Sequence, residues 1–74
     1  MAKLPQVRPD RLVRVLKHIG FRVDRQRGSH VTLEHEDGRA VTVPMHARRD
    51  VPPGLLSSIL EAAKMTADEL RALL

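Results

Sequence analysis

The sequence predicts an α+β fold in which helices cover one face of a three-stranded antiparallel sheet and leave the other face open. Three observations support this prediction. A helical pattern opens the chain, three short runs of alternating apolar and polar residues follow it, and two further helical patterns close it. Residues 1–74 are expected to form a single domain, because a chain of this length hardly suffices for two cores.

The first helix is expected to begin at Pro9 and to stop at Gly20. Proline suits the first helical position, and glycine readily takes the left-handed conformation that ends a helix. The apolar positions between them recur at helical spacing: Leu12, Val13, Leu16 and Ile19. The other face of this helix carries Arg11, Arg14 and His18, which form a basic stripe.

Three strands are expected at residues 21–24, 30–34 and 40–43. Their apolar members all have odd numbers: Phe21, Val23, Val31, Leu33, Val41 and Val43. If all six face one core, facing residues must pair odd with odd, because a slip of one residue turns a strand over. This rule predicts three-residue hairpin loops at residues 26–28 and 36–38, and each loop then ends in a glycine, the residue that such loops favour.

The same register places His30 on the open face of the sheet. Its predicted cross-strand partner is Asp24, and Pro44 lies across the other edge. A carboxylate beside an imidazole can fix its tautomer and raise its pKa. Because the unperturbed pKa of imidazole is about 6.5, His30 is the candidate for taking and giving a proton near neutral pH.

A second helix is expected after residues 47–54, which form a loop. Its core stripe consists of Leu55, Leu56, Ile59, Leu60 and Ala63. Thr66 and Glu69 have the spacing of a capping box, in which each side chain bonds the backbone of the other residue. A short last helix holding Leu70, Leu73 and Leu74 is therefore expected to follow them.

The charge is unevenly distributed along the chain. Residues 1–49 carry eleven Lys and Arg against five Asp and Glu, and ten of the thirteen cations of the whole chain are arginine. Arginine forks onto phosphate better than lysine does, so this balance favours a polyanionic partner over a merely soluble basic surface. Since Phe21 is the only aromatic residue, nucleic acid would be bound through its backbone and shape rather than by stacking of bases.

Other function classes find little support in the composition. The chain has no cysteine, and its four histidines lack the close spacing of metal ligands, so we expect neither a disulfide nor a metal or other cofactor. No membrane-length apolar run or signal-peptide pattern is present, and a cytoplasmic location is the default expectation.

The chain resembles the HicA family of toxins from type II toxin–antitoxin pairs. The resemblance runs over nearly the whole chain and rests on short motifs: Lys3-Leu4-Pro5, Gly20-Phe21, Gly28-Ser29-His30, Asp37-Gly38-Arg39, Val43-Pro44 with His46, and Gly54-Leu55 leading into Ile59-Leu60. It implies a double-stranded-RNA-binding-domain-like fold of α-β-β-β-α order. It also implies a ribonuclease that cleaves messenger RNA and an antitoxin, HicB, that covers its active face.

Carried over to this sequence, the resemblance makes His30 the catalytic residue. Cleavage of RNA by its own 2′-hydroxyl needs a base, an acid and cations for the developing phosphate charge. The residues expected to bind RNA or to stabilise this charge are Gly28, Ser29, Arg25, Arg27, Arg39, Lys3, Arg11 and Arg14. Asp24 and His46 are possible auxiliary residues, and whether His46 supplies a second proton stays open at this point.

Two departures from the family pattern are visible. Many members have a second histidine directly after the first, where this chain has Val31. The second helix carries Ser57, Ser58 and Glu61 where members often show basic residues. The strands and the first half of the chain are therefore the expected contact with RNA.

A second function class remains open from the sequence. A non-catalytic module for structured RNA would use Arg11, Arg14 and Lys17 of the first helix against the backbone and the 2′-hydroxyls. Both classes predict an affinity for RNA that depends on salt. They differ in whether His30 performs chemistry. A pure protein-interaction domain is a third and weaker alternative, for which RNA would not bind even at low salt.

Overall fold

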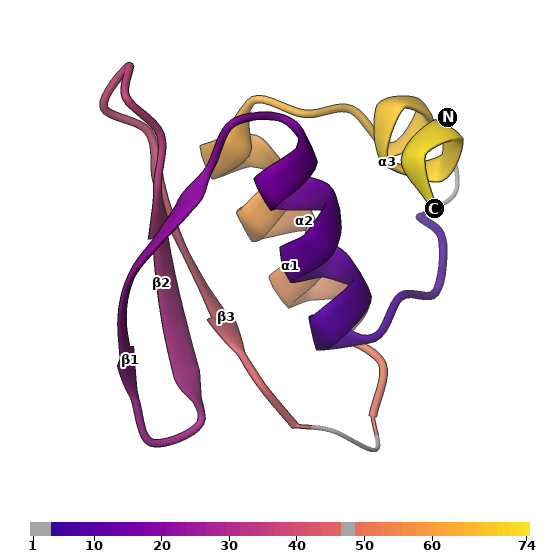
Figure 1. The fold of residues 1–74 in the computed structure, drawn as a ribbon. Helices are drawn as coiled ribbons and strands as arrows, with labels where there is room; N and C mark the ends of the chain where they lie inside the picture. The colour runs from indigo at the N-terminus through magenta and orange to yellow at the C-terminus, as the bar shows by residue number, and fades with distance from the viewer. Residues whose placement is uncertain (1–3, 47–48) are drawn as a thin grey trace.

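The computed structural model describes residues 4–46 and 49–74 and has two layers (Figure 1). Its elements, in chain order, are α1 (Pro9–His18), β1 (Arg22–Arg27), β2 (His30–Glu34), β3 (Ala40–Pro44), α2 (Pro53–Ala63) and α3 (Ala67–Leu73). The strands form an antiparallel sheet in the order β1-β2-β3. Helices α1 and α2 lie on one face of the sheet, which confirms the predicted α+β, double-stranded-RNA-binding-domain-like arrangement with a short helix at its end.

The helix boundaries follow the predicted signals. Pro9 occupies the first turn of α1, and Gly20 has a φ of +105°, in the left-handed region that glycine tolerates best. At the start of α3, the Thr66 hydroxyl accepts the Glu69 backbone N–H at 3.0 Å, and the Glu69 carboxylate accepts the Thr66 N–H at 2.8 Å. The capping box is therefore confirmed, and it fixes where α3 begins.

The hairpin between β2 and β3 has the predicted register. His35 and Arg39 are joined by a backbone hydrogen bond of 2.8 Å, and residues 36–38 form the loop between them. Gly38 takes a φ of +97° at the end of this loop. Each apolar residue of β2 therefore faces an apolar residue of β3, as in the pairs Val31–Val43 and Leu33–Val41.

The predicted hairpin between β1 and β2 is wrong in its register. The loop contains two residues, Gly28 and Ser29, instead of residues 26–28, and His30 faces Arg27 instead of Asp24. The ladder has a β-bulge between Val23 and Arg25, which inserts Asp24 as an extra residue. The bulge joins two registers: the pairs Arg25–Thr32 to Arg27–His30 follow the turn, and the pairs Val23–Leu33 and Arg22–Glu34 are shifted from them by one residue.

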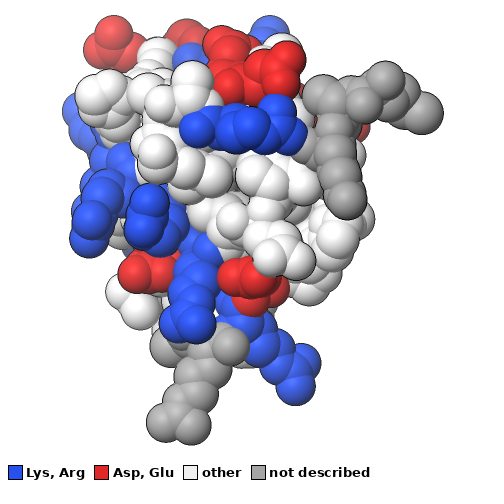
Figure 2. Space-filling view, turned by 90° about the vertical axis from the view of Figure 1, so that its right-hand side faces the viewer, with Lys and Arg blue, Asp and Glu red and all other residues white. Residues whose placement is uncertain are grey.

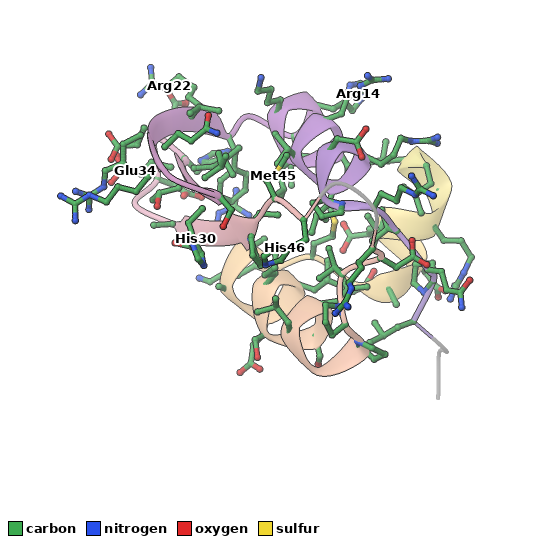
Figure 3. All side chains as sticks on the ribbon, turned by 90° about the horizontal axis from the view of Figure 1, so that it is seen from below. Arg14, Arg22, His30, Glu34, Met45 and His46 are labelled. Atoms are coloured by element: carbon green, nitrogen blue, oxygen red, sulfur yellow. The ribbon has the colours of Figure 1, made fainter. Side chains whose placement is uncertain are left out.

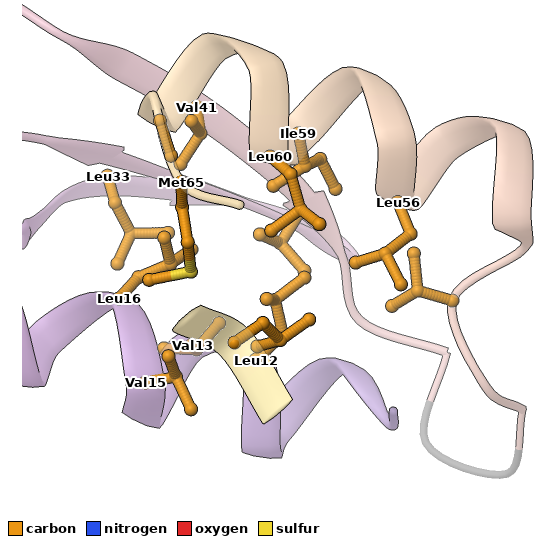
Figure 4. Packing of buried hydrophobic residues seen from close by; sticks show 14 of the residues in the cluster. Leu12, Val13, Val15, Leu16, Leu33, Val41, Leu56, Ile59, Leu60 and Met65 are labelled. Carbon is orange, nitrogen blue, oxygen red and sulfur yellow. The ribbon is translucent and has the colours of Figure 1, made fainter. Parts of the chain in front are cut away.

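The hydrophobic core lies between the sheet and helices α1 and α2 (Figure 4). Its fully buried side chains include Leu12, Leu16, Leu33, Val43, Leu56 and Leu70. Val23, predicted as a core residue, is 44 % exposed. β1 is an edge strand whose six residues are all exposed, so the helices do not extend far enough across the covered face to bury Val23.

Candidate functional site

The turn that precedes His30 is built on a glycine. Gly28 has a φ of +54° at the first position of the two-residue loop, while Ser29 keeps a negative φ. This is the sign pattern of a type II′ turn, which matches the right-handed twist of the paired strands. A Cβ added to Gly28 would meet nothing within 4 Å, so the backbone conformation, rather than crowding, requires glycine at this position.

The side chain of His30 lies on the uncovered face of the sheet. Along β2, His30 and Glu34 are exposed while Val31 and Leu33 are buried, which is the alternation that the sequence predicts. Residues directly opposite one another in a sheet project from the same face. His30 faces Arg27 on one side and Pro44 on the other, so the imidazole stands between a guanidinium-bearing residue and a proline ring.

The bulge in β1 gives this face its positive charge. Beyond the bulge, Arg27 faces His30 and Arg25 faces Thr32, while Arg22 faces Glu34 at the far end of the strand. All three arginines therefore project from the uncovered face. In a strand without a bulge, Arg22 would lie on the opposite face from Arg25 and Arg27, because successive residues alternate between the two faces. A regular ladder running from the Gly28-Ser29 turn would instead have turned Arg22 toward the helices.

Asp24 has a different neighbour from the one predicted. Its carboxylate lies 3.8 Å from the Nε of Arg25, and both side chains are well exposed to solvent. Exposed pairs of this kind contribute little to stability, about 0–1 kcal/mol. Asp24 sits in the bulge and does not face His30, so the predicted contact that would orient the imidazole is absent from this register.

His46 lies at the same end of the sheet as His30. The Met45 backbone N–H donates to the Ser29 carbonyl, which continues the β2–β3 ladder by one residue beyond Pro44. His46 therefore follows at the diagonal position relative to His30, where Cα separations in antiparallel sheets are about 7–8 Å. Figure 3, which views this end directly, shows both imidazoles on it, and His46 is exposed like His30.

Two helices begin at this end of the molecule. Figure 1 shows the β1–β2 turn, the end of β3 and the N-termini of α1 and α2 all at its lower side. Neither N-cap residue, Arg8 or Pro52, caps its helix through a side chain. The first backbone N–H groups of both helices therefore add partial positive charge near His46, which lines a pocket together with Pro9 and Pro52.

Arg39 lies at the opposite end of β2 and is held there. Its Nε donates to both oxygens of Asp37, at 3.1 and 2.8 Å, and its guanidinium lies 5.1 Å from the centre of the Phe21 ring. A further guanidinium nitrogen donates to the Ala63 carbonyl at the end of α2. These contacts tie the β2–β3 hairpin to α2, so the structure does not bring Arg39 together with His30.

The ion pair at this hairpin should make stability depend on pH. The hydrogen bond from the Arg39 backbone N–H, supported by the Arg39 side chain, lowers the pKa of Asp37 from its usual 3.8. A carboxyl with a lowered pKa stabilises the folded state above its usual pKa and loses this contribution as pH falls through the lowered value. Asp37→Asn should therefore lower the Tm at neutral pH, and the difference from wild type should shrink below pH 3.8 and close in stronger acid. A difference in Tm that is the same at both ends of this pH range would contradict the assignment.

The remaining predicted basic residues lie elsewhere. Arg11 and Arg14 are exposed on α1, where they line a groove of about 740 Å³ together with Lys17 of the same helix and Leu73 of α3. Figure 2, which looks onto the side of α3, shows lysine and arginine side chains gathered along one side of this view. Lys3 lies outside the described residues.

His35 packs inside the fold at the far hairpin. Its ring meets the Phe21 ring edge to face with centroids 5.2 Å apart. A Cβ added to Gly20 would come within 2.7 Å of the His35 Nε2, so the imidazole fills the space that the glycine leaves. Among residues 4–46 and 49–74, no group of three His, Asp or Glu side chains is arranged to hold a metal ion.

The fold and the site define a small α+β protein whose uncovered sheet presents an exposed histidine among arginines. The family model described as the HicA toxin of bacterial toxin–antitoxin systems matches residues 9–65, which is most of the chain. The chain therefore belongs to the HicA toxin family, as its resemblance implies. It is a toxin of a toxin–antitoxin system, and such a toxin has an antitoxin as its partner.

No curated protein matches the chain. The family model ends before α3, so the groove between α1 and α3 includes a helix that the model does not cover. Within the part of the chain that the structure describes, no helix is long and apolar enough to span a membrane.

Proposed function

We propose that this toxin is a metal-independent endoribonuclease that cleaves messenger RNA in the cytoplasm, and that His30 is its acid–base residue. The observation that carries the proposal is the exposed imidazole on the uncovered face, directly opposite Arg27. A phosphodiester resting on this face would meet the proton carrier and a cation from two adjacent strands.

The proposed reaction uses the 2′-hydroxyl of the RNA as its nucleophile. A base removes the 2′-proton, the 2′-oxygen bonds to phosphorus, and the 5′-oxygen leaves and takes a proton. His30 takes or gives one of these protons, and His46 at the diagonal position is the candidate for the other. Arg27 stabilises the charge that develops on the phosphate oxygens. Gly28 has no side chain and lets the backbone of the RNA approach the turn closely, and the Ser29 hydroxyl offers a hydrogen bond beside it.

Other basic residues would bind RNA away from the bond that breaks. Arg25 faces Thr32 one step further along the uncovered face, and Arg11 and Arg14 line the groove on α1. Lys3 stays in the proposal as a contact predicted from the motif. A HicB-like antitoxin would silence the enzyme by covering the face that holds His30.

A second candidate function is a non-catalytic module for structured RNA. The groove of about 740 Å³ that Arg11, Arg14 and Lys17 line favours it, because these cations are clustered on α1. Such a module would bind the RNA backbone and leave it intact. Asp24 and Arg39 have no role in either proposal, since neither faces His30 nor lines this groove.

A cleavage assay with a chelator present separates the two candidates. Purified wild-type protein is incubated with a labelled messenger RNA in excess EDTA, and the RNA is followed on a denaturing gel. We expect discrete shorter fragments, and we expect them to disappear as added salt weakens RNA binding. Binding without cleavage under these conditions would favour the module, and neither binding nor cleavage at low salt would overturn both candidates.

A further inference from the structure

A small apolar pocket opens beside the proposed active site. It has a volume of about 90 Å³ and lies between the start of α1, the end of β3 and the segment that leads into α2. Its walls are three prolines and a valine: Pro9, Pro44, Pro52 and Val51. This volume is well below the roughly 300–1,000 Å³ of sites for larger ligands, so the pocket admits only a small group, about the size of a single ring.

The walls of this pocket are held in place by the fold. Val51 is only 4 % exposed, and its backbone N–H donates to the Val7 carbonyl at 2.8 Å. Pro9 is buried in the first turn of α1, and Pro52 is the N-cap residue of α2. Because each proline ring also fixes its own φ, the pocket is formed before any ligand enters.

Pro44 connects the pocket to His30. The hydrogen-bonded pair Ser29–Met45 is followed by the pair His30–Pro44, which is of the non-hydrogen-bonded kind. Cα atoms in such pairs are about 4.5 Å apart, closer than in the hydrogen-bonded pairs. This position also suits proline, which has no N–H to donate on an edge strand. One wall of the pocket is therefore the direct neighbour of the imidazole.

Three further residues complete the lining of the pocket: His46, Arg49 and Asp50. Their side chains carry hydrogen-bond donors and an acceptor, although most of the lining surface is apolar. A planar ring with hydrogen-bonding groups on its edge fits such a lining, because its faces can contact the prolines while its edge meets one of these polar residues. The chain offers no aromatic alternative for such a ring, because Phe21 is 2 % exposed and lies against Arg39.

We propose that this pocket binds one nucleobase of the RNA, next to the phosphate at His30. The inference rests on the proposed function for its substrate, and it adds a base subsite beside a face that otherwise contacts only the phosphate backbone of the RNA. Arg49 hydrogen-bonds the edge of the base, and Asp50 accepts from an amino group where the base has one. The site thereby gives the cleavage a preference for particular bases at one position beside the cut.

An NMR titration of the whole protein tests the pocket without any need for cleavage. The four nucleoside 3′-monophosphates are compared with ribose 5-phosphate, which carries the sugar and the phosphate but no base. We expect the nucleotides to shift the backbone amide of Val51, and we expect the base-free compound not to do so. A response of Val51 to ribose 5-phosphate equal to its response to the nucleotides would overturn the proposal.

Arg49→Ala and Arg71→Ala form a matched pair for the same titration. Both variants remove one exposed guanidinium, and Arg71 lies on α3, outside the residues that line the pocket. Arg49→Ala should weaken nucleotide binding roughly tenfold, the usual effect of losing a hydrogen bond from a charged group, whereas Arg71→Ala should leave it unchanged. If both variants weakened nucleotide binding equally, the loss would come from the lower net charge of the protein and not from a contact in the pocket, and the proposal would be overturned.

The outcomes also separate this inference from the proposed function. If nucleotides bind at Val51 but the protein does not cleave RNA, the base subsite is supported and the proposed ribonuclease activity is wrong. If the protein cleaves RNA but nucleotides do not shift the Val51 amide, the ribonuclease activity is supported and the base subsite is wrong. A pocket that responds to N-acetyl-leucine amide and not to nucleotides would belong to a protein partner, and the base subsite would be wrong.

Discussion

Replacement of His30 by alanine should slow RNA cleavage by about 10²–10⁴-fold, the usual contribution of a positioned acid–base residue. The fold should survive, because the side chain is exposed on a strand whose buried residues, Val31 and Leu33, are untouched. RNA binding should also survive, since Arg25 and Arg27 remain on the same face. The measurement is the rate of cleavage of a labelled RNA in EDTA, alongside the Tm and the Kd for RNA.

Two further variants make this prediction specific to proton transfer. His30→Gln keeps a polar side chain that cannot act as an acid or a base near neutral pH, so this variant should cleave RNA as slowly as His30→Ala. Thr32→Val changes the next position on the same face of β2 while keeping the shape of the side chain, and it should cleave at the wild-type rate. Cleavage by His30→Ala within a few-fold of wild type would remove His30 from the mechanism.

The hairpin between β2 and β3 was predictable because two independent signals agree there. The odd-numbered apolar residues require a three-residue loop, and Gly38 stands where such a loop needs a positive φ. At the other hairpin the same two signals conflict. The turn uses Gly28 in its first position, whereas the pairing of Val23 with Leu33 is shifted by one residue from the register that this turn sets.

A bulge at Asp24 resolves this conflict, and nothing in the local sequence marks it. Parity arguments assume one register for a whole strand, so they place Asp24 opposite His30 and assign Arg27 to a loop. The insertion of one residue changes both assignments at once. The face on which His30 lies was therefore predictable from β2 alone, whereas its neighbours on β1 depended on tertiary structure.

Val23 illustrates a second limit of sequence patterns. Alternation shows which face of a strand is apolar, but it does not show how far the covering helices extend. β1 is the edge strand, and in Figure 1 the helices lie over the other part of the sheet, so Val23 stays exposed. The base pocket was likewise hidden, because Pro9, Pro44 and Pro52 come from three separate segments that only the fold brings together.

Arg27→Ala should lower the rate of cleavage by about 10²-fold, close to the cost of removing one group that stabilises transition-state charge. Arg27 faces His30 across β1 and β2, so its guanidinium can reach the phosphate on which His30 acts. The loss should appear mainly in kcat, because the charge on the phosphate oxygens grows as the bond breaks. Arg27→Lys should recover part of the rate, since it restores the charge without the bidentate geometry of arginine.

Arg22→Ala is the matched control for this prediction. Arg22 lies on the same strand and projects from the same face, but it faces Glu34 at the end of β2 remote from His30. Both variants remove one positive charge from the uncovered face, so long-range attraction of RNA falls in both, and KM should rise to a similar extent. Only Arg27→Ala should also reduce kcat. If the two variants lowered kcat equally, the arginines of β1 would act as a diffuse positive field, and the pairing of Arg27 with His30 would have no part in the chemistry.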